Sequence, residues 1–148
     1  MQGIEDNLKR VEETIRQAAL SCGRDPASIK LLAVSKTFPA EIVERTFRAG
    51  QRLFGENRVQ EAAAKIPSVQ ADGIHWHLVG HLQTNKIRQA VQLFDVIESI
   101  DSEKVARKVD QSCRQIDKVM PVFIQINVGD EPQKFGIRPG QVQEVVEK

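Results

Sequence analysis

Apolar residues near the start of the chain recur at three- and four-residue steps, and further on they form short runs separated by helical patterns. The first pattern predicts a helix with one apolar face that begins at Ile4 and ends near Gly23. Beyond it, strand-like apolar runs alternate with helical stretches of about ten residues. The predicted strands cover 31–36, 52–57, 74–80, 95–99 and 119–128. The predicted helices that follow them cover 39–49, 59–66, 85–93 and 102–113, with another beginning at Pro139.

This alternation indicates right-handed βαβ units and a parallel sheet, which two architectures provide. A doubly wound sheet that binds a dinucleotide usually has G-x-G-x-x-G after its first strand, and the sequence contains no such motif. A (β/α)8 barrel of the TIM type carries its chemistry at the carboxyl ends of its strands. The polar residues that fall there are Lys36, Asn57, His81 and Asn127. We therefore predict an α/β fold of the (β/α)8 TIM-barrel type.

The chain is short for such a barrel. It has 148 residues, whereas a complete barrel takes about 250. The pattern supplies five strands and ends within a predicted helix at 141–148. The expectation is a single domain, residues 1–148, that forms a barrel truncated to about five strands plus an N-terminal helix.

Composition excludes several classes of partner. The net charge of +1 gives no electrostatic case for nucleic acid or an anionic membrane. No apolar run approaches the roughly 20 residues of a membrane span, and the first ten residues are too polar for a signal peptide. Cys22 and Cys113 lack metal-site spacing and are interpreted as reduced thiols in a cytosol. A cytoplasmic protein is expected, and its oligomeric state is left open.

Lys36 is the first candidate for chemistry, because it ends a strand that is otherwise buried. Strand alternation puts Leu32, Val34 and Lys36 on one face, so Lys36 rises from an apolar floor that includes Val34. An amine in that position loses hydration and becomes a better nucleophile for an aldehyde. By position alone, a lysine that simply extends into solvent is the commoner outcome.

Asn57 is the second candidate, in the stretch "FGENRVQE" at 54–61. Gly55 within a short strand suggests the close approach of another backbone or a ligand. Asn57 lies where the strand passes into the helix, so its amide either caps that helix or faces a ligand.

All three histidines lie in 75–81. His75 and His77 share a strand face and His81 follows Gly80, so a zinc site is one hypothesis. No nearby Cys, Asp or Glu completes that site in the sequence. Hydrogen-bonded histidines that line a strand and a loop are the alternative.

The last predicted strand has two amides on one face. Gln125 and Asn127 alternate with apolar residues, and in a barrel the helix-covered side must be apolar, so we expect both amides to point inward. Buried amides require partners, which suggests a polar ligand or a water network. Lys134, in the loop beyond, is either a second amine at the same mouth or a solvated loop lysine.

Four stretches taken together resemble one family. They are "AVSKT", "FGENRVQE", "WHLVGHLQTNK" and "INVGDEPQKFGI", at 33–37, 54–61, 76–86 and 126–137. In this order and spacing they resemble the pyridoxal 5′-phosphate homeostasis proteins (the YggS/PROSC-like family), which are similar in fold to the barrel domain of alanine racemase. The resemblance implies that Lys36 forms an internal aldimine with pyridoxal 5′-phosphate above the Val34 floor. It further implies that Asn57 lies beside the cofactor ring, and that Lys134 is a lysine of the site region.

The sequence departs from the family in one respect, because the later strands that hold the cofactor phosphate are missing. This agrees with the barrel rule that phosphate binds by the loops after strands seven and eight. We therefore expect the cofactor phosphate to be held weakly.

Three functions remain in view. The first is a non-catalytic carrier that holds the cofactor on Lys36 and serves vitamin B6 and amino-acid homeostasis, with pyridoxal 5′-phosphate as its partner and apoenzymes as candidate recipients. The second is a racemase-like enzyme, which needs a second base. In alanine racemase that base is a tyrosine, and this chain has none, although a histidine can take the same role. The third is a binding module without cofactor, in which Lys36 is inert.

Overall fold

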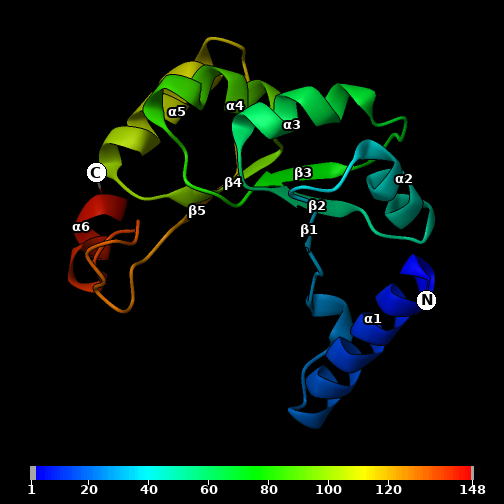
Figure 1. The fold of residues 1–148 in the computed structure, drawn as a ribbon. Helices are drawn as coiled ribbons and strands as arrows, with labels where there is room; N and C mark the ends of the chain where they lie inside the picture. Colours follow the sequence, from blue (N-terminus) through cyan, green and yellow to red (C-terminus); the bar gives the residue numbers. More distant parts are fainter. Residues whose placement is uncertain (1–2, 148) are drawn as a thin grey trace.

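The computed structural model describes residues 3–147, and its centre is one parallel sheet of five strands. The strands are β1 (Ala33–Val34), β2 (Leu53–Glu56), β3 (His75–Leu78), β4 (Val96–Ile100) and β5 (Val122–Ile124). The helices are α1 (Ile4–Ser21), α2 (Ala40–Arg48), α3 (Val59–Lys65), α4 (Ile87–Leu93), α5 (Glu103–Arg114) and α6 (Val142–Val146). Each strand from β1 to β4 is followed by the helix that leads back to the start of the next strand (Figure 1).

The order of the strands decides between the two predicted architectures. The strands lie side by side in chain order, β1 to β5, and every neighbouring pair is parallel. A doubly wound sheet reverses its order at a switch point, whereas a βα barrel proceeds in one direction. The prediction of a barrel-type sheet is therefore confirmed.

The hydrophobic core lies between the sheet and helices α3, α4 and α5, which cover one face (Figure 1). Phe54, Trp76, Leu78 and Ile97 project from the strands into this layer, where they are almost fully buried. The helices meet them with small and branched residues at three- and four-residue spacing, which is the apolar stripe that a covering helix presents. These residues are Val59, Ala62, Ile87, Ala90, Val91, Val105, Val109 and Cys113.

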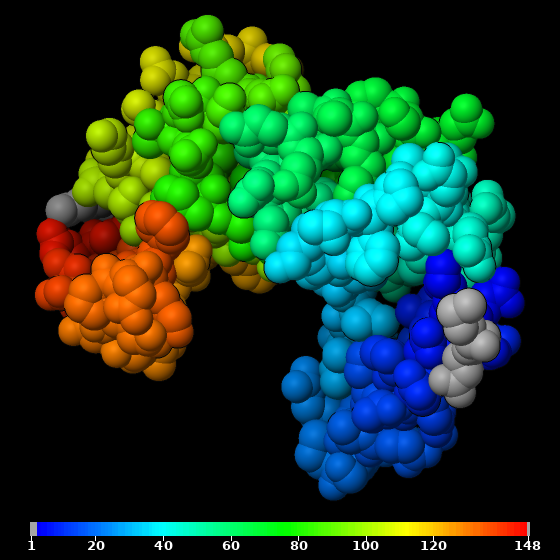
Figure 2. Space-filling view, in the orientation of Figure 1, coloured from blue at the N-terminus to red at the C-terminus, as the bar shows by residue number. Residues whose placement is uncertain are grey.

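The opposite face of the sheet, here called the open face, is not covered by helices α3 to α5. Figure 2 shows the molecule hollowed on this side, between α1 and the segment 126–138. Apolar side chains are consequently accessible there. Val34 is 44% exposed, and Phe123, which alternates with Val122 along β5, is 60% exposed. In a closed barrel this face would be the interior.

The first and last strands fall furthest short of their predicted lengths. β1 has two residues, because it pairs with β2 only at Ala33 and Val34. β5 has three residues. Beyond Ile124 the chain pairs instead with its own following loop: Ile126 and Ile137 form an isolated parallel bridge, and Asn127 N donates to Ile137 O at 2.9 Å. The prediction of a strand through 119–128 is wrong for that reason.

The two cysteines are free thiols, as the sequence suggested. Cys22 is exposed at the end of α1, and Cys113 is buried in α5, where burial raises the pKa of its thiol. Within residues 3–147, no helix has the length and apolar character needed to cross a bilayer.

Candidate functional site

Lys36 lies in a tight turn just beyond β1, at the edge of the sheet where the carboxyl ends of the strands meet. In this turn, the Lys36 turn (residues 35–38), Phe38 N donates to Ser35 O at 3.1 Å. Thr37 has a φ of 67°, a left-handed conformation that is uncommon for a β-branched residue. The Lys36 side chain is exposed, and its amine has no hydrogen-bond or ion-pair partner among the described residues. The amine is therefore available to an incoming group.

The floor beside the turn is apolar and contains a glycine. A Cβ on Gly55 would lie 3.3 Å from Val79 Cγ1 and 3.4 Å from both Leu32 Cδ2 and Val34 Cγ2. Leu32 and Val34 therefore share the open face around Gly55, as strand alternation predicted. A side chain at this position would fill the space that the glycine leaves in the floor.

Asn57 faces a hollow rather than capping a helix. The residue before α3 is Arg58, and no side chain caps that helix end, so the capping interpretation of Asn57 is wrong. Its amide has no partner among the described residues, and it lines a hollow of about 590 Å³ with Gly80 and His81. Gly80 is required here, because a Cβ on it would lie 2.1 Å from Asn57 O.

A buried ion pair stands directly behind the Lys36 turn, on the helix-covered face. Glu56 of β2 is fully buried, and its Oε1 lies 2.7 Å from Lys65 Nζ of α3. The same amine donates to Ser35 O at 2.7 Å, and Ser35 Oγ donates to Glu56 Oε1 at 2.7 Å. Sequence reasoning missed this network. The one available signal was a carboxylate at a helix-covered strand position, which needs a cation.

Two of the three histidines lie close to carboxylates. His77 Nδ1 lies 2.6 Å from Glu98 Oε1, and His81 Nδ1 lies 3.0 Å from Asp101 Oδ2. His81 also stacks on Phe135, with ring centroids 3.6 Å apart. His75 lies apart, on the strand end opposite Lys36. In the part of the chain that the structure describes, no group of three or more His, Cys, Asp or Glu residues could hold a metal ion.

The two amides of the last predicted strand are satisfied by their own loop. Gln125 Nε2 donates to Phe135 O at 3.1 Å, and Asn127 Nδ2 donates to Glu131 O at 2.8 Å. The expectation that they meet a ligand or a water network is corrected, because backbone carbonyls of 131–135 take that role. Lys134 forms an ion pair with Glu131 in the same loop and remains exposed.

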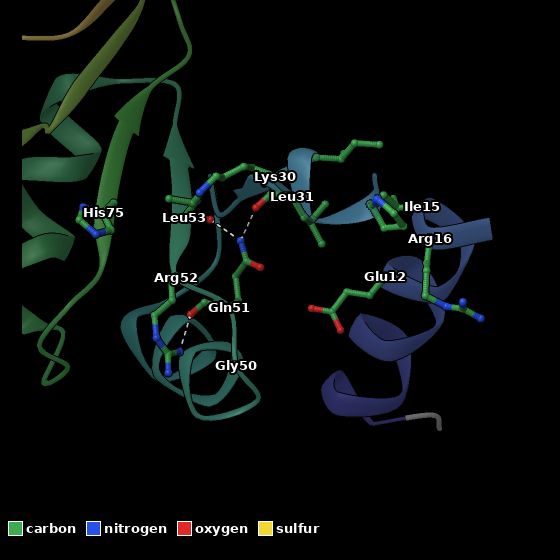
Figure 3. A pocket seen from close by; sticks show the side chains of 12 residues that line it. Glu12, Ile15, Arg16, Lys30, Leu31, Gly50, Gln51, Arg52, Leu53 and His75 are labelled. Carbon is green, nitrogen blue, oxygen red and sulfur yellow. Dashed lines mark hydrogen bonds between the residues drawn. The ribbon is translucent and has the colours of Figure 1, made fainter. Parts of the chain in front are cut away.

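A second hollow, of about 490 Å³, lies at the amino ends of the strands, between α1 and the start of β2 (Figure 3). Glu12 reaches toward it from α1, whereas the Arg16 side chain points away from β2 (Figure 3). The Gln51 amide fills part of it, donating to Leu31 O at 2.8 Å and Leu53 O at 2.6 Å. This hollow is at the amino ends of the strands, away from Lys36, so it does not belong to the candidate site.

The groups at the Lys36 edge fit a flat ring that carries an aldehyde. The Lys36 amine supplies a nucleophile, and the Asn57 amide supplies an unpaired donor and acceptor. The floor around Gly55 is apolar and shallow.

Comparison with known proteins agrees with this reading. The sequence matches the family described as "Alanine racemase, N-terminal domain" over residues 4–148. It is 41% identical over 148 residues to the pyridoxal phosphate homeostasis protein of Escherichia coli (strain K12), covering 98% of this chain and 63% of that protein. The chain thus spans less than two thirds of the length of the curated relatives it matches.

The chain is also similar to solved structures, of which two are described here. An unknown protein from Bifidobacterium adolescentis superimposes with a TM-score of 0.90 at 31% identity, over 97% of this chain and 62% of the other. PipY of Synechococcus elongatus PCC7942, solved with pyridoxal phosphate bound, superimposes with a TM-score of 0.75 at 38% identity. That match covers 89% of this chain and 61% of PipY.

Proposed function

The chain belongs to the alanine racemase N-terminal domain family, and we propose that it binds pyridoxal 5′-phosphate through Lys36. The observation that carries the proposal is the unpartnered Lys36 amine at the carboxyl edge of a barrel-type sheet. PipY, a structure 38% identical to this chain, contains the same cofactor. When bound, the cofactor supplies an aldehyde that reacts reversibly with a lysine amine.

Three groups of the chain would hold the cofactor. Lys36 bonds to it, and the Asn57 amide lies beside the ring at the mouth of the neighbouring strand. Leu32 and Val34 form the apolar floor around Gly55. Asn57 is included because no described residue bonds to its amide, although the backbone of Gly80 packs closely against Asn57.

The role we propose is cofactor homeostasis without committed catalysis. The curated relatives carry the name pyridoxal phosphate homeostasis protein. A racemase needs a second base near the reacting carbon, and the tyrosine that has this role in alanine racemase is absent from this sequence. A site with an amine but no committed acid–base pair can take up the cofactor and release it. We place this exchange in the cytoplasm, with apoenzymes as recipients.

Titration with pyridoxal 5′-phosphate tests the proposal. The wild-type chain should develop the visible absorbance of a lysine-bound cofactor, and Lys36→Met should abolish that absorbance. Lys134→Met is the matched control, since Lys134 is an exposed lysine of the neighbouring loop that is paired with Glu131. If Lys36→Met and Lys134→Met titrate alike, the proposal is wrong.

A further inference from the structure

We propose that the buried Glu56–Lys65 ion pair positions the Lys36 turn, so that Lys36 meets the aldehyde in a fixed orientation. This inference rests on the proposed function of Lys36 and assigns a positioning role to two residues that do not touch the cofactor. The pair connects β2 and α3 to the turn through a single residue, Ser35.

Ser35 is held at both its backbone and its side chain. Lys65 Nζ donates to Ser35 O, and Ser35 Oγ donates to Glu56 Oε1, each at 2.7 Å. Ser35 N donates to Gly55 O at 2.9 Å, which joins the turn to the sheet. With these contacts, the residue immediately before Lys36 has almost no freedom to rotate or shift.

The turn itself needs such support. Thr37, the residue after Lys36, has a φ of 67°, and a non-glycine residue in this region persists only where its surroundings fix it. The carbonyl that closes the turn, Ser35 O, is the one that Lys65 binds. Lys65 therefore stabilises the acceptor on which the strained turn depends.

A contribution to folding stability does not by itself explain why the Glu56–Lys65 ion pair is buried. Glu56 is fully buried, its second oxygen Oε2 has no hydrogen-bond partner among the described residues, and Lys65 is 11% exposed. Such pairs often stabilise a fold no better than apolar residues of the same size. A role in fixing one conformation of the adjacent turn accounts for its position.

Covalent labelling of the chain by pyridoxal 5′-phosphate and borohydride tests the inference, with the labelled lysine identified by peptide mass mapping. In Lys65→Met, the labelling rate of Lys36 should fall by about tenfold or more, because a displaced nucleophile loses its alignment. The share of label on the exposed Lys30 and Lys134 should rise. Lys65→Arg keeps a cation with several donors and should restore most of the rate.

Lys118→Met is the matched control for loss of a half-buried amine. Lys118 Nζ donates to Val91 O at 2.8 Å and Phe94 O at 2.7 Å, far along the chain from the Lys36 turn. This variant should lose stability yet label Lys36 at the wild-type rate. Equal rates for Lys65→Met and Lys118→Met would overturn the inference while leaving the proposed function intact. An unlabelled Lys36 in the wild type would overturn both.

A milder pair of variants decides the matter if Lys65→Met does not fold. Ser35→Ala removes only the hydroxyl that binds Glu56, and we expect Lys36 labelling to slow about fivefold. Ser99→Ala removes another buried strand hydroxyl, one without a hydrogen-bond partner in the described chain, and should have no effect. Equal labelling in these two variants refutes the positioning role.

Discussion

At the scale of single residues, the site depends on which polar groups are used and which are left over. Glu56, Lys65 and Ser35 bind one another, whereas the Lys36 amine and the Asn57 amide have no partner in the described chain. Unused polar groups that border a hollow are available to a ligand without first breaking an existing bond. We therefore propose that the three bonded residues support the Lys36 turn, and that the two unbonded groups contact the ligand.

Gly80 gives a prediction about the position of Asn57. Gly80→Ala places a Cβ against Asn57 O, at 2.1 Å before any relaxation, and should destabilise the chain by about 2 kcal/mol through overpacking. Denaturant unfolding measures the loss. Gly140→Ala is the control, because nothing lies within 4 Å of its Cβ position. If both variants unfold alike, the close approach of Gly80 to Asn57 does not exist.

A second prediction concerns chemistry at the α-carbon of amino acids. The sequence contains no tyrosine to act as the second base, so we expect the cofactor-loaded chain to exchange the α-proton of alanine far below ordinary enzyme rates of roughly 1 s⁻¹. Deuterium incorporation followed by NMR is the measurement. Exchange near that rate that disappears in Lys36→Met would show a racemase-like enzyme instead of a carrier.

At the scale of elements, the alternation of strands and helices was predictable, because a helix-covered parallel sheet leaves a clear apolar pattern. The strand ends were not. The predicted strand 119–128 continues to alternate through Gln125 and Asn127, yet pairing stops at Ile124 because 126–127 pairs with Ile137. Alternation shows which residues share a face, but it does not show which segment supplies the neighbouring hydrogen bonds.

The candidate site was predictable in part for the same reason. Lys36 and Asn57 stand next to strand ends, where local sequence signals the position. The support behind them joins β1, β2 and α3 through contacts between residues 21 and 30 positions apart. Such contacts depend on how α3 packs, which no local pattern specifies.

The cap of α5 gives a prediction at this scale. Ser102 Oγ accepts a hydrogen bond from Val105 N, so Ser102→Ala should lower the free energy of unfolding by about 1 kcal/mol. Ser21→Ala is the control, since its hydroxyl only donates to Ala18 O within an exposed helix end. Urea denaturation compares the two variants. An equal loss of unfolding free energy in both would show that the Ser102 cap does not stabilise α5.

At the scale of the whole molecule, the sheet has two unpaired edges and an accessible apolar face. Within the described residues, β1 and β5 each have one strand neighbour, and Val34, Phe123 and Val128 are exposed. Unpaired edges and apolar patches are sites of association. The chain also spans less than two thirds of its curated relatives. We propose that residues 1–148 correspond to a barrel of about five strands.

This arrangement predicts that the 148-residue chain, produced alone, self-associates. Sedimentation velocity should show an average mass that rises with concentration, and Phe123→Lys should weaken the association by placing a charge on the apolar face. Lys108→Gln, on the exposed side of α5, should leave it unchanged. A wild-type chain that stays monomeric at every concentration contradicts the prediction.

Borohydride reduction followed by peptide mapping shows which lysine holds the cofactor. The chain is saturated with pyridoxal 5′-phosphate, reduced with borohydride and digested, and the peptides are analysed by mass spectrometry. We expect one dominant pyridoxyl group, on the peptide that contains Lys36, because its amine is exposed and has no partner among residues 3–147. A label found mainly on Lys30 or Lys134, or spread evenly over the exposed lysines, would contradict it.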